Sequence, residues 1–237
     1  MRPQLNTTAI VLAAGKGKRL GALASKPLVE INSKPVLSYC LYTLSRHPEI
    51  TGIVVVANSQ NLQGVKNIIK ESGVGKVRAV ILGGKRRQDS VLAGLKALDN
   101  KAGLVLIHDA DRPFIDRKDL TRVLSAAGTC GAAILGIPVK ATIKQGKRQK
   151  AKGKTCLPLI IEKTIERDRL WEAQTPQVFR REIILEAYRR FKDISVTDDS
   201  SLVERLGYPV IIVQGSELNI KITTPGDLIL AETIARE

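Results

Sequence analysis

Cysteine and histidine, the residues of many metal and nucleophilic sites, are scarce in this chain. Its 237 residues include three cysteines and two histidines. Cys40, Cys130 and Cys156 lie far apart and form no CxxC pair, so their spacing favours buried reduced thiols over a zinc site or a disulfide framework. No Ser/His/Asp or Cys/His arrangement is evident, and we expect His47 and His108 to be structural. Covalent nucleophilic catalysis is therefore disfavoured.

Aromatic residues and long apolar runs are also few. Aromatics make up 3% of the chain, and no RRM, KH or zinc pattern is present, which argues against a nucleic-acid-binding protein. No apolar run approaches the roughly 18–20 residues of a membrane span. The N-terminus shows no signal-peptide core, so we expect a cytoplasmic protein with no membrane partner. Hydrophobic residues still reach 43%, enough for a core, and we predict a single domain over residues 1–237.

Acidic residues are outnumbered by basic ones. The chain has 38 Lys and Arg against 23 Asp and Glu, a formal net charge of +15. Most of the excess lies in three short segments, 16–26, 85–89 and 140–154. A balance this basic indicates either a nucleic acid or a phosphate-rich small substrate as the partner. Because two of the three segments are expected to be loops at strand ends, their placement favours the small polyanion.

Short apolar runs alternate with helical patterns over the first half of the chain. The runs are typical of buried strands, apolar on both faces, at residues 7–13, 52–57, 77–82, 103–107 and 132–137. Apolar stripes with helical spacing lie at residues 36–44, 91–98 and 120–127. This alternation predicts βαβ units, and hence a Rossmann-like α/β fold in three layers around a mostly parallel, twisted sheet.

Residues 138–164 break the alternation. The segment is rich in Gly and Lys and has no helical stripe, so we predict an extended β-arm that leaves the body. Ordered structure is expected to resume at 171–179. The elements expected after it are helices at 180–191 and 198–206, strands at 209–213 and 219–222, and a last helix from Thr224-Pro225.

A glycine-rich loop follows the first predicted strand, at residues 13–20. The Rossmann GxGxxG and the Walker GxxxxGK[ST] patterns both fail at Leu20. Gly15 and Gly17 still allow backbone N–H groups to approach phosphate oxygens, and cations accompany them up to Lys26. These features suit a bound triphosphate, and a plain strand–helix turn with a basic, solvated edge is the alternative.

Asp109 ends one of the apolar strands. An ionised carboxylate is costly there unless it is paired or bound to a metal. Mg²⁺ prefers oxygen ligands and typically uses one or two carboxylates together with phosphate oxygens. We therefore predict Asp109 as a ligand of Mg²⁺. Capping of the next loop or an ion pair with Arg112 would produce the same pattern.

Five motifs in order resemble a known family. They are AAGKGKRL…SKP from Ala13, GGKRRQDSV from Gly83, HDADRPF from His108, LWEAQTPQVF from Leu170 and NIKITTP from Asn219. Together they resemble the 2-C-methyl-D-erythritol 4-phosphate cytidylyltransferases, a family of GT-A-like nucleotidyltransferases in the non-mevalonate isoprenoid pathway. The resemblance runs from about residue 8 to the C-terminus.

The resemblance implies that CMP is transferred from CTP to 2-C-methyl-D-erythritol 4-phosphate, with release of pyrophosphate and use of Mg²⁺. An enzyme of the same fold with another polyol phosphate as acceptor, such as ribitol 5-phosphate, is the alternative. The resemblance also implies a homodimer in which the arm reaches the partner's site and completes it in trans.

The resemblance further assigns roles to residues. The implied catalytic residues are Arg19, Lys26, Arg167 and Lys221. The implied nucleotide-binding residues are Ala13, Ala14, Gly15, Lys16, Gly17, Gly83, Gly84, Ser90 and Asp109. The implied acceptor-binding residues are Thr142, Arg167, Thr175, Lys221 and Arg112.

Three positions depart from the family pattern. Lys85 replaces an acid found in some relatives, and Ala141 stands where Asp is usual. Asp111 stands where Ala is expected. Its carboxylate has three possible roles: to pair with a cation such as Arg112, to contact the metal, or to face water. We favour a pair with a neighbouring cation.

Overall fold

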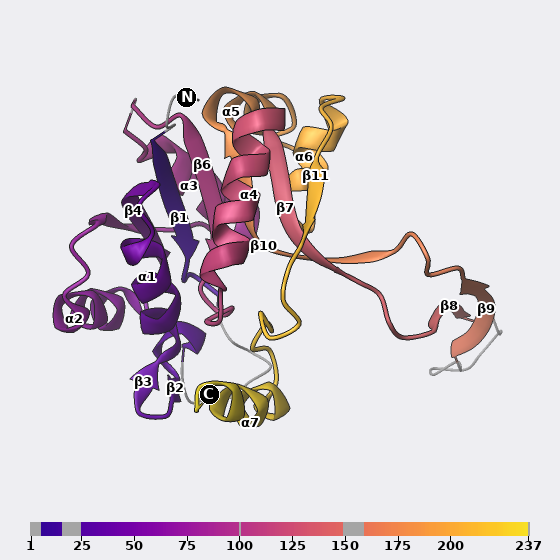
Figure 1. The fold of residues 1–237 in the computed structure, drawn as a ribbon, viewed down its shortest axis with the longest axis horizontal. Coiled ribbons are helices and arrows are strands. Elements are labelled where there is room, and N and C mark those ends of the chain that lie inside the picture. The colour runs from indigo at the N-terminus through magenta and orange to yellow at the C-terminus, as the bar shows by residue number, and fades with distance from the viewer. Residues whose placement is uncertain (1–5, 16–24, 100, 149–158, 237) are drawn as a thin grey trace.

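The computed structural model of the chain describes residues 6–15, 25–99, 101–148 and 159–236. Its centre is a seven-stranded sheet with helices on both faces (Figure 1). The strands, in spatial order, are β11 (Ile211–Gln214), β7 (Ala132–Pro138), β10 (Trp171–Arg180), β6 (Leu104–Asp109), β1 (Thr7–Leu12), β4 (Ile50–Ala57) and β5 (Val77–Leu82). Neighbouring strands are parallel except at β10, which is antiparallel to both β6 and β7. The predicted mostly parallel sheet is confirmed.

Seven α-helices are present in the described part of the chain. They are α1 (Val36–Arg46), α2 (Leu62–Ser72), α3 (Arg87–Lys96), α4 (Arg117–Cys130), α5 (Arg181–Arg190), α6 (Ser200–Arg205) and α7 (Pro225–Ile234). None of the helices that the structure describes combines the length and the apolar character needed to cross a membrane.

The strands are continuously apolar because both faces of the sheet are covered. In β1, Ala9 and Val11 pack in a core cluster with residues of α1, α2 and α4. Ile10, between them, packs in a second cluster with residues of α3, α5 and α6. All three side chains are fully buried. Alternate side chains thus enter opposite layers, which gives the predicted three-layer arrangement.

One α-helix was not predicted from the sequence, and one predicted strand does not form. The missed helix is α2. Residues 219–222 form no strand; the backbone N–H of Ile222 bonds instead to the carbonyl of Asp111 at 2.8 Å. This segment lies against a loop rather than beside another strand, so no ladder of hydrogen bonds forms.

The segment predicted as an arm contains a small sheet of its own. After β7, strands β8 (Ile143–Arg148) and β9 (Leu159–Ile165) pair antiparallel in a separate two-stranded sheet. Figure 1 shows this sheet well away from the body of the molecule. Leu159 and Ile161 on β9 are 71% and 65% exposed. Residues 149–158, which include Cys156, lie outside the described residues.

Between β1 and α1 the chain forms a short 3-10 helix, η2 (Lys26–Leu28), and a hairpin of β2 (Glu30–Ile31) and β3 (Lys34–Pro35). Helix α7 contacts β2. Its N-cap Thr224 accepts a hydrogen bond from the backbone of Asp227, whose carboxylate in turn accepts one from the backbone of Thr224. This reciprocal cap, with Pro225 at the first helical position, starts the helix where the sequence predicts it.

Candidate functional site

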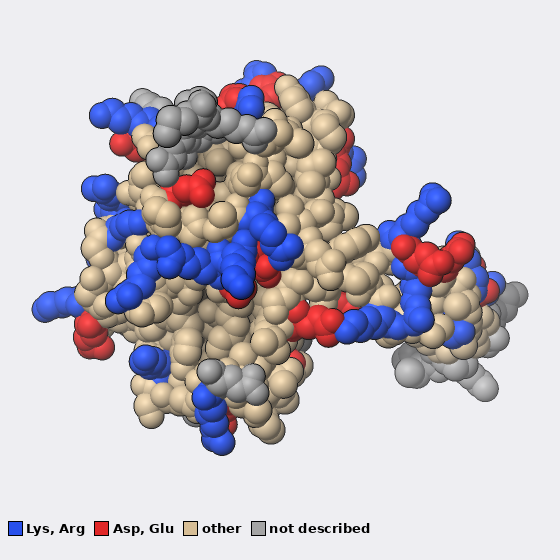
Figure 2. Space-filling model, viewed as in Figure 1, with Lys and Arg blue, Asp and Glu red and all other residues tan. Residues whose placement is uncertain are grey.

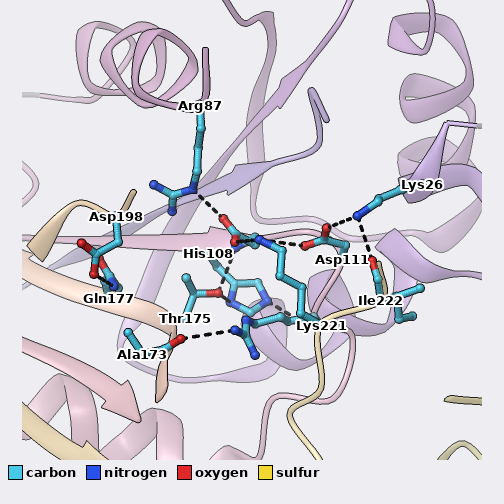
Figure 3. A network of polar contacts seen from close by, with 12 residues as sticks. Lys26, Arg87, His108, Asp111, Ala173, Thr175, Gln177, Asp198, Lys221 and Ile222 are labelled. Atoms are coloured by element: carbon cyan, nitrogen blue, oxygen red, sulfur yellow. Dashed lines mark hydrogen bonds and ion pairs between the residues drawn. The ribbon is translucent and has the colours of Figure 1, made fainter. Parts of the chain in front are cut away.

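Polar side chains from distant segments meet at the carboxyl ends of β1 and β6. These two strands are paired in register from Thr7–Leu104 to Leu12–Asp109. The segment after β11, residues 219–223, reaches the same edge, as the bond from Ile222 to Asp111 shows. Ligands of open α/β sheets bind at the carboxyl ends of the strands. Figure 3 shows the side chains gathered there.

Asp109 lies at the centre of this group and is contacted on both oxygens. Its Oδ1 accepts a hydrogen bond from Nε of Arg87 at 3.0 Å, and its Oδ2 accepts one from Nζ of Lys221 at 2.6 Å. The side chain is only 9% exposed. Burial alone would raise the pKa of this carboxyl, but the charges of Arg87 and Lys221 outweigh it and hold the pKa well below its usual range. Asp109 is therefore ionised at any physiological pH.

Arg87, at the start of α3, connects Asp109 to a second buried acid. Its Nη1 donates to Oδ2 of Asp199 at 2.7 Å. Tyr188 donates to the other oxygen of Asp199 at 2.5 Å. Burial opposes the charge on Arg87, but the two carboxylates outweigh it and raise the pKa of the guanidinium. The basic segment 85–89 is thus partly neutralised by the fold itself, since Arg86 also pairs with Asp89, at 2.7 Å.

Asp111 pairs with a cation, as we favoured, but the partner is Lys26 instead of Arg112. Nζ of Lys26 lies 3.1 Å from Oδ2 of Asp111 and 2.9 Å from the carbonyl of Ile222 (Figure 3). Nζ of Lys221 lies 3.8 Å from Oδ1 of Asp111. Two lysines and two aspartates therefore form one cluster from three separate segments of the chain. This cluster contains both of the catalytic lysines that the family resemblance implies.

Behind the cluster, a chain of hydrogen bonds runs through His108. Thr175 Oγ1 accepts the backbone N–H of Asp109 at 3.1 Å and lies 3.0 Å from Nδ1 of His108. Nε2 of His108 lies 2.9 Å from the carbonyl of Arg112, which can only accept. Burial lowers the pKa of His108 to about 4, so the ring is neutral at pH 7. Its proton therefore sits on Nε2, and the hydroxyl of Thr175 donates to Nδ1.

Arg112 faces backbone carbonyls. Its Nη1 donates to the carbonyl of Asn219 at 2.7 Å, and its Nη2 lies 3.4 Å from that of Ala173. The side-chain amide of Asn219 donates to the carbonyl of Thr175 at 2.9 Å. Arg112 thus holds the 219–223 segment, and with it Lys221, against β10. We considered an ion pair between Asp109 and Arg112 as an alternative, and the described part of the structure contains no such pair.

Gly83 and Gly84 lie against the first turn of α3. A Cβ at Gly83 would come within 2.5 Å of Oγ of Ser90 and 2.9 Å of Val56, and one at Gly84 within 2.3 Å of Cβ of Asp89. The N–H of Gly84 donates to Oγ of Ser90 at 3.2 Å. The structure thus requires glycine at both positions for packing, independently of any bound base.

The start of the glycine loop is held by a buried residue that the motifs did not reveal. The side-chain amide of Asn61 donates to the carbonyl of Ala13 at 2.8 Å and to Oγ of Ser25 at 2.6 Å. Asn58 donates in the same way to the carbonyl of Ala14 at 3.1 Å. Asn61 thereby links Ala13, before the loop, to Ser25, after it. Its only sequence signal is an asparagine just before α2, which is also typical of a helix start.

Several predicted site residues are not part of this cluster. Lys16, Gly17 and Arg19 lie outside the described residues. Thr142 and Arg167 are exposed near the base of the arm, where Arg167 donates to the carbonyl of Lys140. Among the described residues, no hydrogen bond or ion pair joins either of them to the Asp109 cluster.

Charged side chains are distributed unevenly over the face of the molecule that Figure 2 shows. Lys and Arg side chains form a band across the middle of the face in Figure 2, with acidic groups directly beside it.

Among the described residues, no group of three or more His, Cys, Asp and Glu side chains is placed to hold a metal ion. A cation at Asp109 therefore needs most of its ligands from elsewhere, such as a bound phosphate.

Known sequences match the chain over nearly its whole length. The profile of a family described as 2-C-methyl-D-erythritol 4-phosphate cytidylyltransferase matches residues 7–237. A protein of that name from Syntrophus aciditrophicus is 44% identical over 240 residues, which cover 100% of this chain and 98% of the relative. Another from Dehalococcoides mccartyi is 42% identical over 229 residues, 97% of this chain and 96% of the relative.

Solved structures agree with the sequence matches. The crystal structure of 4-diphosphocytidyl-2C-methyl-D-erythritol synthase from Anaerococcus prevotii superposes with a TM-score of 0.82 and 32% identity, over 99% of this chain and 97% of that one. The crystal structure of 2-C-methyl-D-erythritol 4-phosphate cytidylyltransferase from Thermus thermophilus superposes with a TM-score of 0.73 and 30% identity, over 97% of this chain and 98% of that one. The chain belongs to the 2-C-methyl-D-erythritol 4-phosphate cytidylyltransferase family.

Proposed function

We propose that this chain, acting as one nucleotidyltransferase domain with a protruding arm, transfers CMP from CTP to 2-C-methyl-D-erythritol 4-phosphate and releases pyrophosphate. Family membership gives the reaction. The observation that carries it at the site is the cluster of Lys26, Lys221, Asp109 and Asp111 beside the start of the glycine loop. A nucleoside triphosphate is bound by cations together with backbone amides that donate to its phosphate oxygens.

The reaction is an in-line attack by the acceptor phosphate on the α-phosphorus of CTP. Such a transfer depends on positioning and on charge stabilisation more than on covalent help from the protein. Lys26 is 11% exposed and held by two acceptors, so its ammonium is already placed at the sheet edge. We propose that Lys26 and Arg19 stabilise the charge that develops in the transition state. Loss of one such donor typically costs about 10²–10³ in rate.

We propose that Mg²⁺ binds at Asp109. This carboxylate is ionised, and a divalent ion fits it in place of the ammonium of Lys221, which contacts Oδ2 at 2.6 Å. When bound, the ion neutralises phosphate charge and orients the triphosphate. Lys221, 37% exposed, then becomes available to a phosphate. The protein supplies few ligands, as is usual where Mg²⁺ is shared with substrate phosphates.

Three of the implied acceptor-binding residues divide into two groups. Thr175 is 5% exposed and its hydroxyl has two partners, so we propose that it orients Asp109 through the backbone rather than contacting the acceptor. Thr142 and Arg167 are exposed near the arm and suit an anionic acceptor. We propose that they act in the site of a second copy, in a homodimer formed through the arm. The exposed Leu159 and Ile161 would be covered in that dimer.

Pyrophosphate release with CTP and Mg²⁺ tests the proposal, with each candidate acceptor in turn. We expect turnover with 2-C-methyl-D-erythritol 4-phosphate, and we expect the enzyme to act in the cytoplasm. Turnover with ribitol 5-phosphate alone would reject the acceptor while leaving the reaction class intact. Lys26→Ala should lower the rate about 10²-fold or more. Lys34→Ala, which removes an exposed lysine of β3, is the matched control and should be active.

A further inference from the structure

The carboxylate of Asp111 lies between the ammonium groups of Lys26 and Lys221. Its Oδ2 is 3.1 Å from Nζ of Lys26 and its Oδ1 is 3.8 Å from Nζ of Lys221. The side chain of Asp111 is 16% exposed and that of Lys26 is 11% exposed. An ion pair this well shielded from water is screened less than a surface pair. Asp111 therefore has a considerable influence on both cations.

The backbone supports the same arrangement. Asp111 accepts the N–H of Ile222 at 2.8 Å through its own carbonyl, and Lys26 donates to the carbonyl of Ile222 at 2.9 Å. Lys26 is thus fixed by two acceptors, of which only Asp111 is charged. A lysine side chain otherwise loses considerable rotamer entropy when it is held in one geometry. The position of the Lys26 ammonium depends on Asp111.

We propose that Asp111 is a positioning residue that sets Lys26 in place and competes with the triphosphate for its ammonium group. The inference rests on the proposed function, since it assumes that CTP binds at this edge. While the site is free of CTP, Asp111 serves as the counter-ion of Lys26. When CTP binds, a phosphate oxygen shares the ammonium of Lys26 with the carboxylate, and the repulsion between these two anions lowers the affinity for CTP. Asp111 thereby weakens binding and favours turnover.

Two substitutions separate the two effects. Asp111→Ala removes both the negative charge and the hydrogen-bond acceptor. Asp111→Asn removes the charge but keeps a carbonyl oxygen that can accept from Lys26. We expect the KM for CTP to fall about 3- to 10-fold in both variants, because both lose the competing charge. We expect kcat to fall about 10-fold in Asp111→Ala and to change less than about 3-fold in Asp111→Asn.

Equilibrium binding gives a second measurement that does not depend on turnover. CTP is titrated calorimetrically without Mg²⁺ and without acceptor, into the wild-type protein and each variant. The control is Glu71→Gln, which removes one exposed negative charge on α2 outside the cluster. We expect tighter CTP binding in both Asp111 variants, by a factor that shrinks as salt is added, and unchanged binding in the control.

The outcomes distinguish this inference from the proposed function. Wild-type protein that binds no CTP and releases no pyrophosphate would contradict the proposed function itself. Wild-type activity together with equal CTP affinity in all variants would overturn only the role of Asp111. A raised Mg²⁺ requirement in Asp111→Ala, with an unchanged KM for CTP, would assign the residue to the metal and overturn the inference as well. Equal loss of kcat in Asp111→Asn and Asp111→Ala would exclude positioning through the hydrogen bond.

Discussion

The guanidinium of Arg87 contacts the buried carboxylate of Asp199 at 2.7 Å, although the two residues lie 112 positions apart. Asp199 is 0% exposed, and its other oxygen accepts the hydroxyl of Tyr188. The same guanidinium holds Asp109 through Nε. Arg87 therefore anchors the central carboxylate of the site to the helical layer on one face of the sheet.

Removal of this anchor should destabilise the protein strongly. Arg87→Met leaves the buried Asp199 without a cation and Asp109 with Lys221 alone, and an uncompensated buried charge typically costs about 3–5 kcal/mol in the free energy of unfolding. Urea denaturation measures the change. Arg86→Met is the matched control, since Arg86 is 51% exposed and its removal should change stability far less. Equal midpoints for the two variants would show that the buried pairing contributes nothing to stability.

The double variant Arg87→Met with Asp199→Asn should recover part of the loss. It removes the carboxylate that Arg87→Met leaves without a cation, while the amide that replaces it can still accept from Tyr188. Its free energy of unfolding should lie above that of Arg87→Met alone. A further decrease, equal to the sum of the single effects, would argue against direct coupling of these residues.

His108 should make the stability of the protein depend on pH. Burial lowers its pKa in the folded state to about 4, against about 6.5 in the unfolded chain. The unfolded state therefore binds more protons between these values, so the stability present above pH 6.5 is lost as pH falls through 4. The loss from this group is about 3 kcal/mol at most.

Nuclear magnetic resonance can measure the titration of His108 directly. The chain has only two histidines, so His47→Gln leaves a single imidazole signal to follow. We expect that signal to change near pH 4. Titration close to pH 6.5 would contradict the neutral, buried ring and the tautomer assigned from the contact with Arg112.

Two glycines of the site should respond differently to substitution by alanine. A Cβ at Gly83 would lie 2.5 Å from Oγ of Ser90, whereas one at Gly15 would meet no atom of the described residues within 4 Å. Gly83→Ala should therefore lower thermal stability, because α3 must shift. Gly15→Ala should leave stability unchanged and raise the KM for CTP, because the methyl group obstructs the approach of a phosphate. Unchanged KM in Gly15→Ala would argue against phosphate contact at this position.

Asn61→Ala should affect both stability and turnover. The side chain is fully buried, and its loss leaves the carbonyl of Ala13 without that donor, at a cost of about 1–3 kcal/mol. It also releases Ser25, next to Lys26, so kcat should fall as well. Chemical denaturation and pyrophosphate release measure the two effects. Asn67→Ala, an exposed asparagine on the same helix, should change neither.

Much of the fold follows from local patterns. The strands of β1, β4 and β6 were predicted because apolar side chains on both faces are the signature of a covered parallel sheet. Helix α2 was not predicted, although its sequence carries the signal: Leu62, Val65, Ile68 and Ile69 have the spacing of one helical face and pack in or against the core. The expected strand at 219–222 resembles a strand in composition, and only the absence of a neighbouring strand prevents pairing.

For the site, too, local sequence predicts some features and the folded chain alone shows the others. Local sequence is enough to predict which residue types lie at the strand ends: Asp109 after an apolar run, the glycines after β1, and a lysine in each of two distant motifs. The partners of these residues are seen only in the folded chain, where Asp111 pairs with Lys26, Arg87 links Asp109 to Asp199, and Arg112 binds backbone carbonyls. Charges pair only when they lie a few ångströms apart, and the sheet topology brings together residues that are far apart in the sequence.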